Sequence, residues 1–225
     1  MTMAATAPEQ RWVTSGESSE PPVLSSGDAR RARRSRRREQ LLVAAGEAFA
    51  AGGYYATSMD NISRIAGVSK PILYQHFSNK LDLYLAVLQG HIDVLVHNVR
   101  HALRSTTDNE QRVRAAVEAY FDFVDDRTQG YRVVFESDVP SEPSVQWRTA
   151  QGIEACVDAI FDLVSHNSGL DNHRARTLAV GLVGASQFAA QYWLEAGRPI
   201  PKSEAVEATV TLCWGGVSRL PRRPS

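Results

Sequence analysis

A 22-residue stretch, MDNISRIAGVSKPILYQHFSNK, runs from Met59 to Lys80 and has the pattern of two short helices joined by a tight turn. Ile62, Ile65 and Ala66 recur at spacings of three and four, which predicts one apolar stripe on the first helix. Gly67 follows at once, and glycine commonly ends a helix in a left-handed conformation. The chain is therefore expected to turn sharply after this helix.

A second helix is predicted directly after the turn. Ser69 stands at the N-cap position, and Pro71 falls in the first turn, where a missing amide proton costs little. We expect Ile72, Leu73 and Phe77 on its buried side. The exposed side and leading turn then carry hydrogen-bonding, cationic or flat side chains: Ser69, Lys70, Pro71, Tyr74, Gln75 and His76. A helix of this kind reads base edges in the major groove of DNA. An ordinary helical hairpin with a solvated face is the alternative.

The order of residues in this stretch resembles the signature of TetR-type transcriptional regulators. The resemblance rests on Ile65-Ala66-Gly67-Val68-Ser69, Leu73-Tyr74-Gln75-His76-Phe77 and Lys80. It implies an all-α homodimer with a three-helix DNA-binding domain and a larger helical domain that binds an effector and dimerises. Pro71 and Ile72 stand where many members have a small polar residue, which leaves their part in base reading open. The DNA-binding residues that we expect are Thr57, Ser69, Lys70, Pro71, Tyr74, Gln75, His76 and Lys80.

Charge is distributed unevenly along a chain whose formal net charge is zero. Residues 36–80 hold six basic and three acidic residues, whereas residues 81–225 hold 14 basic and 18 acidic ones. Positive charge is thus concentrated where DNA would bind, as counterion release requires. The run of arginines between Arg30 and Arg38 is either a solvated tail or an arm that adds phosphate or minor-groove contacts.

Helical periodicity predicts an all-α fold, and helix-breaking residues divide the chain into its helices. Residues 1–34 have no sustained apolar period and are expected to be a disordered tail. A DNA-binding domain is predicted over residues 35–82, with its first helix at 35–51, and an effector-binding and dimerisation domain over residues 83–220. One long helix, 81–104, belongs to both domains and can transmit a rigid-body movement. Further helices are predicted at 109–126, 129–136, 144–165, 171–196 and 203–217.

The larger domain is rich in apolar side chains, a composition that fits a ligand cavity and a plain core equally well. If a cavity is present, we expect a long apolar lining from Leu103, Tyr120, Val124, Ile160, Val164, Leu182 and Phe188. Stretches such as Gln129-Gly130-Tyr131-Arg132 and Ser168-Gly169-Leu170-Asp171 resemble actinobacterial TetR-type regulators of fatty acid synthase genes. This resemblance implies a long-chain acyl-CoA effector that weakens DNA binding. The resemblance does not decide between activation and repression. The alternative function is a TetR-type repressor of another operon that responds to a different apolar small molecule.

Dimerisation is expected on the last two long helices. Gly181, Gly184 and Ala185 permit close helix approach, and Trp193 and Trp214 offer large apolar surfaces, unless both tryptophans pack within the chain. A twofold dimer presents two reading helices about 34–36 Å apart, or a multiple of that spacing, and predicts a palindromic operator.

Other classes of function have less support in the sequence. The six histidines form no recognisable catalytic pattern and no Gly-rich phosphate loop follows a strand, so we expect no enzyme. Asp93, His97 and His101 share a helical face that suits a metal, although a solvated stripe is commoner, and we predict neither metal nor cofactor. Cys156 and Cys213 are expected to be reduced. The sequence shows neither a signal peptide nor a spanning segment, so we expect a cytoplasmic protein without membrane contact.

Overall fold

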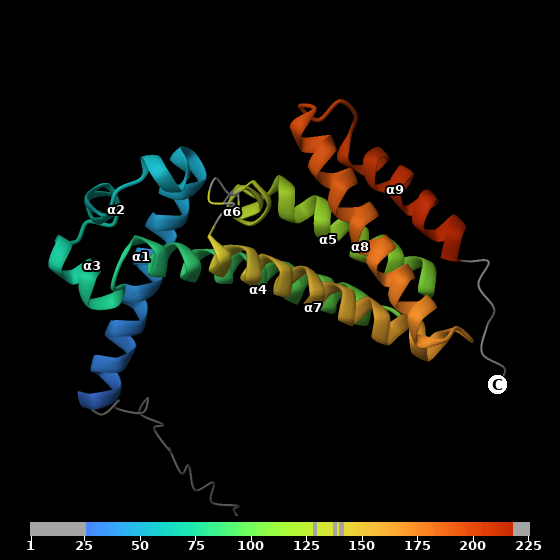
Figure 1. Ribbon diagram of the computed structural model, residues 1–225, viewed down its shortest axis with the longest axis horizontal. Coiled ribbons are helices and arrows are strands. Elements are labelled where there is room, and N and C mark those ends of the chain that lie inside the picture. Colours follow the sequence, from blue (N-terminus) through green and yellow to red (C-terminus); the bar gives the residue numbers. More distant parts are fainter. Residues whose placement is uncertain (1–25, 128–129, 137–138, 140–141, 218–225) are drawn as a thin grey trace, which may run out of the picture. The chain divides into compact units, whose positions relative to one another are not determined.

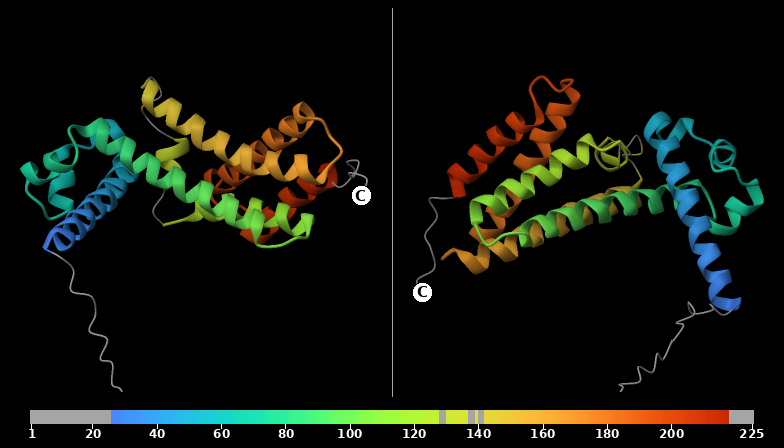
Figure 2. Two further views of the ribbon diagram at one scale, coloured as in Figure 1. Left: turned by 90° about the horizontal axis from the view of Figure 1, so that it is seen from below. Right: turned by 180° about the vertical axis from the view of Figure 1, so that it is seen from behind.

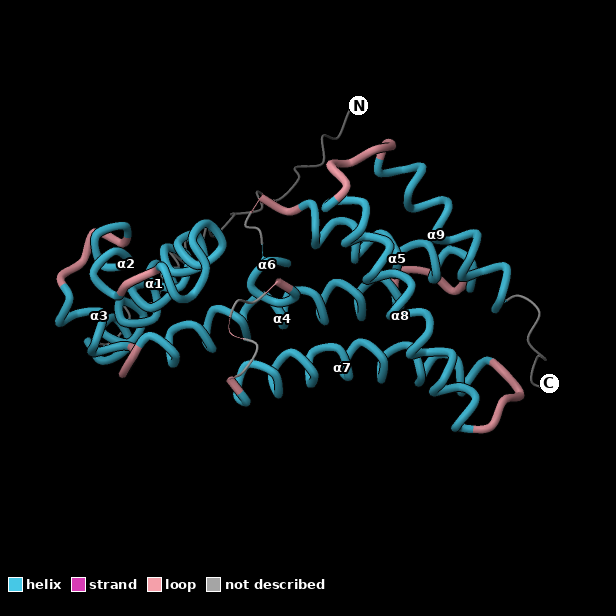
Figure 3. Tube along the Cα trace, turned by 45° about the horizontal axis from the view of Figure 1, so that its top comes forward, coloured by secondary structure: helices cyan, strands magenta, loops and turns pink. Residues whose placement is uncertain are grey.

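The computed structural model covers residues 1–225 and describes residues 26–127, 130–136, 139 and 142–217. The described part is helical and contains no β-strand, which confirms the predicted fold class (Figures 1 and 3). The chain divides into two compact units, Met1–Arg36 and Arg37–Ser225. The domain boundary that we expected near residue 82 lies inside the second unit. In chain order the helices are α1 (Ser26–Ala56), α2 (Met59–Ile65), α3 (Lys70–His76), α4 (Lys80–Arg104), α5 (Asn109–Asp125), α6 (Gly130–Phe135), α7 (Pro143–Asn167), α8 (Asn172–Glu195) and α9 (Lys202–Val217).

Helix α1 begins at Ser26, nine residues before the predicted start, so the expectation of a disordered tail was wrong for residues 26–34. We relied on an apolar period, whereas arginine and alanine are good helix formers without one. Asp28 in the first turn also complements the helix dipole. The predicted end was close, because Gly53 adopts a left-handed φ of 74° and interrupts the helix before its last residues. Residues 1–25 lie outside the described part of the chain.

A small apolar core holds α1, α2, α3 and the start of α4 together. Leu41 from α1, Ile62 from α2 and Leu73 from α3 are completely buried. Full burial of such side chains contributes about 1.5–3 kcal/mol each. An aromatic cluster extends this core, since the ring of Tyr84 on α4 meets the rings of Phe49 and Tyr54 edge to face, at centroid distances of 5.0 and 5.2 Å.

The larger core is formed by the long helices. Helix α4 packs against α5 and α7, α7 packs against α8, and α5 packs against α8 and α9 (Figures 1 and 2). Val99, Val117 and Phe121 are almost fully buried where these helices meet. Helices α4 and α7 lie close together at Gly152, where an added Cβ would lie 2.6 Å from Ile92 Cγ2. A larger residue there would require Ile92 or the helix backbone to move.

The corner between α8 and α9 corrects one expectation about the dimer. Trp193 is buried within its own chain, where its indole Nε1 donates a hydrogen bond to the Ile200 carbonyl at 2.8 Å. Arg198 and Lys202 pair with Asp125 on α5 and hold this corner in place. Trp193 therefore does not serve as an interface residue, because the corner uses its ring for internal packing. Trp214 is half-buried against the core. None of the described helices is long and apolar enough to cross a membrane.

Candidate functional site

The turn between α2 and α3 has the predicted construction. Ser58 caps α2 by accepting a hydrogen bond from the Asn61 amide at 3.1 Å. Gly67 adopts a φ of +63°, and the Val68 amide then donates back to the Ser63 carbonyl at 3.0 Å. Ser69 occupies the N-cap position of α3, but its side chain makes no capping bond. Its hydroxyl is exposed at the start of the helix.

Helix α3 presents most of the predicted DNA-binding residues on one exposed surface. Leu73 and Phe77 are buried beneath it, and Ile72 is half-buried. The side chain of Tyr74 is 44% exposed, which is high for so large an aromatic group. His76 is half-buried at the end of the helix. We name the exposed set the α3 face: Ser69, Lys70, Pro71, Tyr74 and Gln75.

Lys70 on the α3 face pairs with Asp60 on α2, with 2.8 Å between Nζ and Oδ1. The hydrogen bond to the Asp60 carboxylate raises the pKa of Lys70, so the ammonium stays charged. Both side chains are more than half exposed. Exposed ion pairs are weak because water screens them. Lys70 is thus available to exchange the carboxylate for another anion.

Two residues predicted to bind DNA have internal partners instead. Thr57 is 3% exposed, and its hydroxyl donates to the Ala48 carbonyl at 3.1 Å. Lys80 Nζ donates to the carbonyls of Tyr54 and Thr57 at 2.9 and 3.1 Å and lies 4.2 Å from the centre of the Tyr54 ring. Thr57 satisfies a carbonyl within α1 and Lys80 satisfies two carbonyls near its end, and buried backbone groups need such partners. We therefore correct their assignment from DNA contact to support of the DNA-binding domain.

The residues predicted to line an apolar cavity fall into two groups. Leu103, Tyr120, Val124, Ile160 and Val164 are buried in the larger core, and Leu182 is half-buried. Phe188 is 70% exposed on α8, so it was wrongly placed in the cavity. Helix α8 has apolar residues on more than one side, and periodicity alone did not show which side faces inward.

The Tyr120 hydroxyl is the one buried side-chain polar atom without a hydrogen-bond partner in the described part of the chain. The Cys156 thiol lies near it. Burial raises the pKa of Tyr120 well above its usual value and also raises that of Cys156. A bound ligand can supply the hydrogen-bond partner that this buried hydroxyl lacks.

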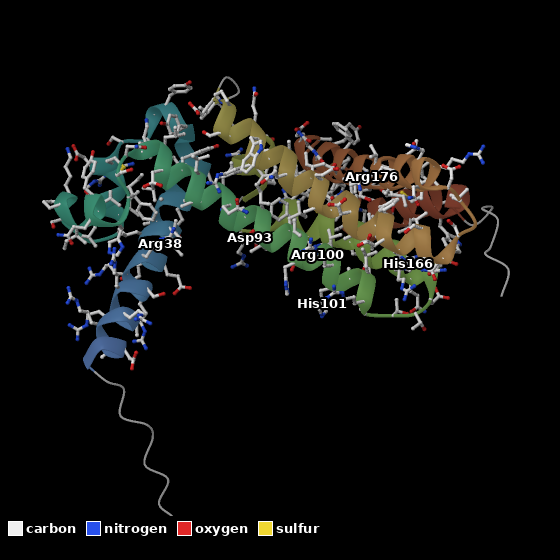
Figure 4. All side chains as sticks on the ribbon, turned by 60° about the horizontal axis from the view of Figure 1, so that its bottom comes forward. Arg38, Asp93, Arg100, His101, His166 and Arg176 are labelled. Carbon is white, nitrogen blue, oxygen red and sulfur yellow. The ribbon has the colours of Figure 1, made fainter. Side chains whose placement is uncertain are left out.

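A hollow of about 600 Å³ lies between α4 and α7. We name it the α4–α7 groove. Its polar lining includes Asp93, His97, Arg100, His101, Arg104 and Arg148. Figure 4 shows Asp93, Arg100 and His101 along α4, beside α7. None of the seven predicted cavity residues lines it.

Sequence reasoning did not identify this groove as a site. The spacing of Asp93, His97 and His101 on one helix gave a signal, which we interpreted as a solvated stripe or, less often, a metal site, and we did not include Arg100 and Arg104. No group of three or more metal-ligating side chains occurs among the described residues.

Helices α8 and α9 carry exposed apolar side chains. Val180, Phe188 and Tyr192 on α8 and Leu212 on α9 are each more than half exposed. Gly181 and Gly184 on α8 have open space where a Cβ would be. We name Val180, Phe188, Tyr192 and Leu212, with these two glycines, the α8–α9 surface. Large exposed apolar groups of this kind mark interaction surfaces.

A short helix with an exposed polar face, set by a left-handed glycine turn and followed by a larger helical domain, has the construction of a helix-turn-helix DNA-binding motif. Comparison with known proteins identifies its family. Residues 41–87 match the family of bacterial regulatory proteins called tetR, and residues 109–216 match the tetracyclin repressor-like C-terminal domain.

The HTH-type transcriptional activator FasR of Mycolicibacterium smegmatis is 59% identical over 175 residues, which are 78% of this chain and 80% of that protein. The chain belongs to the TetR family and is a transcriptional regulator close to FasR.

Solved structures have the same fold. Bacillus subtilis FadR in complex with stearoyl-CoA gives a TM-score of 0.67 at 15% identity and covers 79% of this chain and 98% of its own. A tetR-family regulator from Streptomyces coelicolor gives a TM-score of 0.67 at 24% identity, with 82% of both chains covered.

Proposed function

We propose that the protein regulates genes of fatty acid or lipid biosynthesis and that a long-chain acyl-CoA weakens its binding to double-stranded DNA. The observation that carries this proposal is the 59% identity to FasR over most of both chains. FadR of B. subtilis supports the ligand class, because a protein of this fold holds stearoyl-CoA. A regulator that binds operator DNA acts in the bacterial cytoplasm.

The α3 face is proposed to read the operator. Tyr74 and Gln75 point hydrogen-bonding and flat groups outward, and such groups contact base edges in the major groove. Lys70 and Ser69 are suited to phosphate oxygens, which position a helix without reading sequence. His76 contributes from the half-buried end of α3. The arginines at the start of α1 are proposed to add phosphate contacts, which would make operator affinity depend on salt.

The effector is proposed to enter the larger core among Leu103, Tyr120, Val124, Ile160 and Val164. Leu182, which is half-buried, is proposed to lie at the edge of this region. An acyl chain there would replace contacts between core side chains and separate the helices. An apolar lining with few polar groups is the usual environment for such a ligand.

Contacts at the start of α4 are proposed to couple the two sites. Lys80 ties this helix to the end of α1, and the Tyr84 hydroxyl donates to the Val133 carbonyl of α6 at 3.3 Å. Arg132 of α6 donates to the Ala50 carbonyl of α1 at 3.3 Å. Helices α1, α4 and α6 therefore share hydrogen bonds, and a ligand that shifts α4 or α6 would also move the α3 face.

The α8–α9 surface is proposed to form a homodimer. Phe188 and Leu212 are each 70% exposed, and a twofold interface would cover both. A palindromic operator follows, with half-sites about 34–36 Å apart or at a multiple of that spacing.

A gel-shift titration tests the proposal. The full-length protein is mixed with the promoter of the fatty acid synthase genes from its own genome, with palmitoyl-CoA, a short-chain acyl-CoA or free coenzyme A. Release of DNA by palmitoyl-CoA alone is the expected result. Binding that ignores every acyl-CoA would favour a DNA-binding dimer without this effector. Failure to bind the promoter would favour another operon and a different apolar ligand.

A further inference from the structure

The charge of the α4–α7 groove is opposite to that of the chain around it. Residues 81–225 carry more acidic than basic residues. The groove nevertheless has Arg100, Arg104 and Arg148 in its lining, together with two histidines, against the single carboxylate of Asp93. A local excess of positive charge in a concave site attracts anions.

The guanidinium groups of the groove have few partners. Arg148 donates to the Gln89 side-chain carbonyl at 2.9 Å, and the amide of the same glutamine donates to Asp93 at 2.9 Å. Among the described residues, Arg100 and Arg104 form no ion pair and no hydrogen bond through their side chains. Elsewhere on the surface Arg114, Arg176 and Arg198 each pair with a carboxylate. The two arginines of α4 are therefore free to bind an external anion.

The lining of the α4–α7 groove borders the larger core along α7. It includes Gly152 and Ala155, and the next residue, Cys156, is completely buried. Burial raises the pKa of the Cys156 thiol, and the positive charge of Arg100 in the groove opposes that rise. Cys156 in turn lies near the unpartnered hydroxyl of Tyr120. The buried Cys156 side chain therefore follows the groove lining directly in the sequence and lies near the Tyr120 hydroxyl.

We propose that the α4–α7 groove binds the phosphate groups of an acyl-CoA, while the Tyr120 hydroxyl donates a hydrogen bond to the carbonyl of its acyl group. Arginine binds phosphate oxygens through paired, charge-assisted hydrogen bonds, and His97 and His101 add donors beside them. The volume of the groove falls within the range of about 300–1,000 Å³ for small-molecule sites. The assignment rests on the proposed function, since it presumes an acyl-CoA effector. It adds that the protein distinguishes the thioester from the free fatty acid.

Calorimetric titration of the full-length protein with palmitoyl-CoA and with palmitate tests the assignment. The variants are Arg100→Gln with Arg104→Gln, and Tyr120→Phe. Arg174→Gln is the matched control, because Arg174 is an exposed arginine on α8 outside the groove. Thermal melting of every variant reports folding independently of the ligand.

We expect wild type and the Arg174→Gln control to bind palmitoyl-CoA more tightly than palmitate. The double arginine variant should bind palmitoyl-CoA about 10–100-fold more weakly, because it loses charge-assisted hydrogen bonds to phosphate. Its affinity for palmitate should stay the same. Added salt should weaken the binding of palmitoyl-CoA to wild type more than to the variant. Tyr120→Phe should weaken both ligands, because both carry a carbonyl at the same position.

Three results would overturn the assignment. Unchanged affinity of the double arginine variant for palmitoyl-CoA would overturn the assignment of the groove and leave the proposed function intact. An equal loss for palmitate and palmitoyl-CoA would show that the arginines do not recognise phosphate. No binding of palmitoyl-CoA to wild type would remove both the assignment and the proposed effector.

Discussion

The α3 face and the α4–α7 groove are both polar surfaces, but they are constructed differently. The α3 face comes from a single run of residues, Ser69 to Gln75, and a glycine turn sets its direction. The groove combines residues of α4 with residues of α7 that lie more than 40 positions later in the chain. A surface formed by one short helix depends on local backbone geometry. A surface between two helices exists only when the whole larger domain packs correctly.

The largest expected effect of a single change is on the α3 face. Tyr74→Ala removes an exposed aromatic side chain that the small core does not use. We expect operator affinity to fall by about 1–3 kcal/mol for each half-site, without a change in melting temperature. Fluorescence anisotropy with operator DNA measures the first quantity and circular dichroism the second. Trp147→Ala is a control with a more exposed aromatic side chain on α7, and it should leave DNA binding unchanged. Equal operator affinities for wild type and Tyr74→Ala would exclude Tyr74 from the DNA contact.

Substitutions at two lysines distinguish a residue that contacts DNA from a residue that supports the fold. Lys80→Met leaves the carbonyls of Tyr54 and Thr57 without their donor, so we expect a loss of about 1–3 kcal/mol in the free energy of unfolding. Lys70→Met breaks only an exposed ion pair and should leave stability unchanged. It should instead lower operator affinity and reduce the slope of its salt dependence by about 1 for each phosphate that the variant no longer neutralises. Chemical denaturation and binding at several salt concentrations measure both variants. A stable Lys80→Met protein with weakened DNA binding would restore Lys80 to the DNA contact.

Substitution of Gly130 on α6 tests the packing of α6 against α4. A Cβ there would overlap the His91 imidazole on α4, so Gly130→Ala should destabilise the fold by about 1–3 kcal/mol. Gly90→Ala meets nothing within 4 Å and should stabilise α4 by about 0.5–1 kcal/mol. Adding His91→Ala should make Gly130→Ala less harmful, because the imidazole is what the methyl group meets. Thermal melting of the four variants, including the double variant, gives the coupling. Strict additivity would mean that His91 and Gly130 do not share this contact.

The parts of the fold that sequence reasoning predicted well are those that local chemistry determines. The expected helix at 81–104 is observed at Lys80–Arg104, and the one at 109–126 at Asn109–Asp125. Gly67 and the buried Leu73 and Phe77 were also predicted, because spacing along one helix is enough to identify them.

Long-range partners account for what was missed. A cationic side chain looks the same in sequence whether it binds a phosphate or, like Lys80, a carbonyl 26 residues away. The groove was missed because Arg100 and Arg148 come together only through the packing of α4 on α7. The exposure of Phe188 depended on which side of α8 meets α7 and α5.

Reciprocity between the two sites provides the most direct test of the central claim, that an acyl-CoA in the larger domain weakens DNA binding. If the effector lowers operator affinity by some factor, operator DNA must lower effector affinity by the same factor. The affinity for palmitoyl-CoA is therefore measured by calorimetry on the free protein and on its complex with operator DNA. We expect a decrease of about 5–150-fold in the complex, equal to the loss of operator affinity at saturating palmitoyl-CoA. Identical affinities for palmitoyl-CoA in the presence and absence of DNA would contradict the claim.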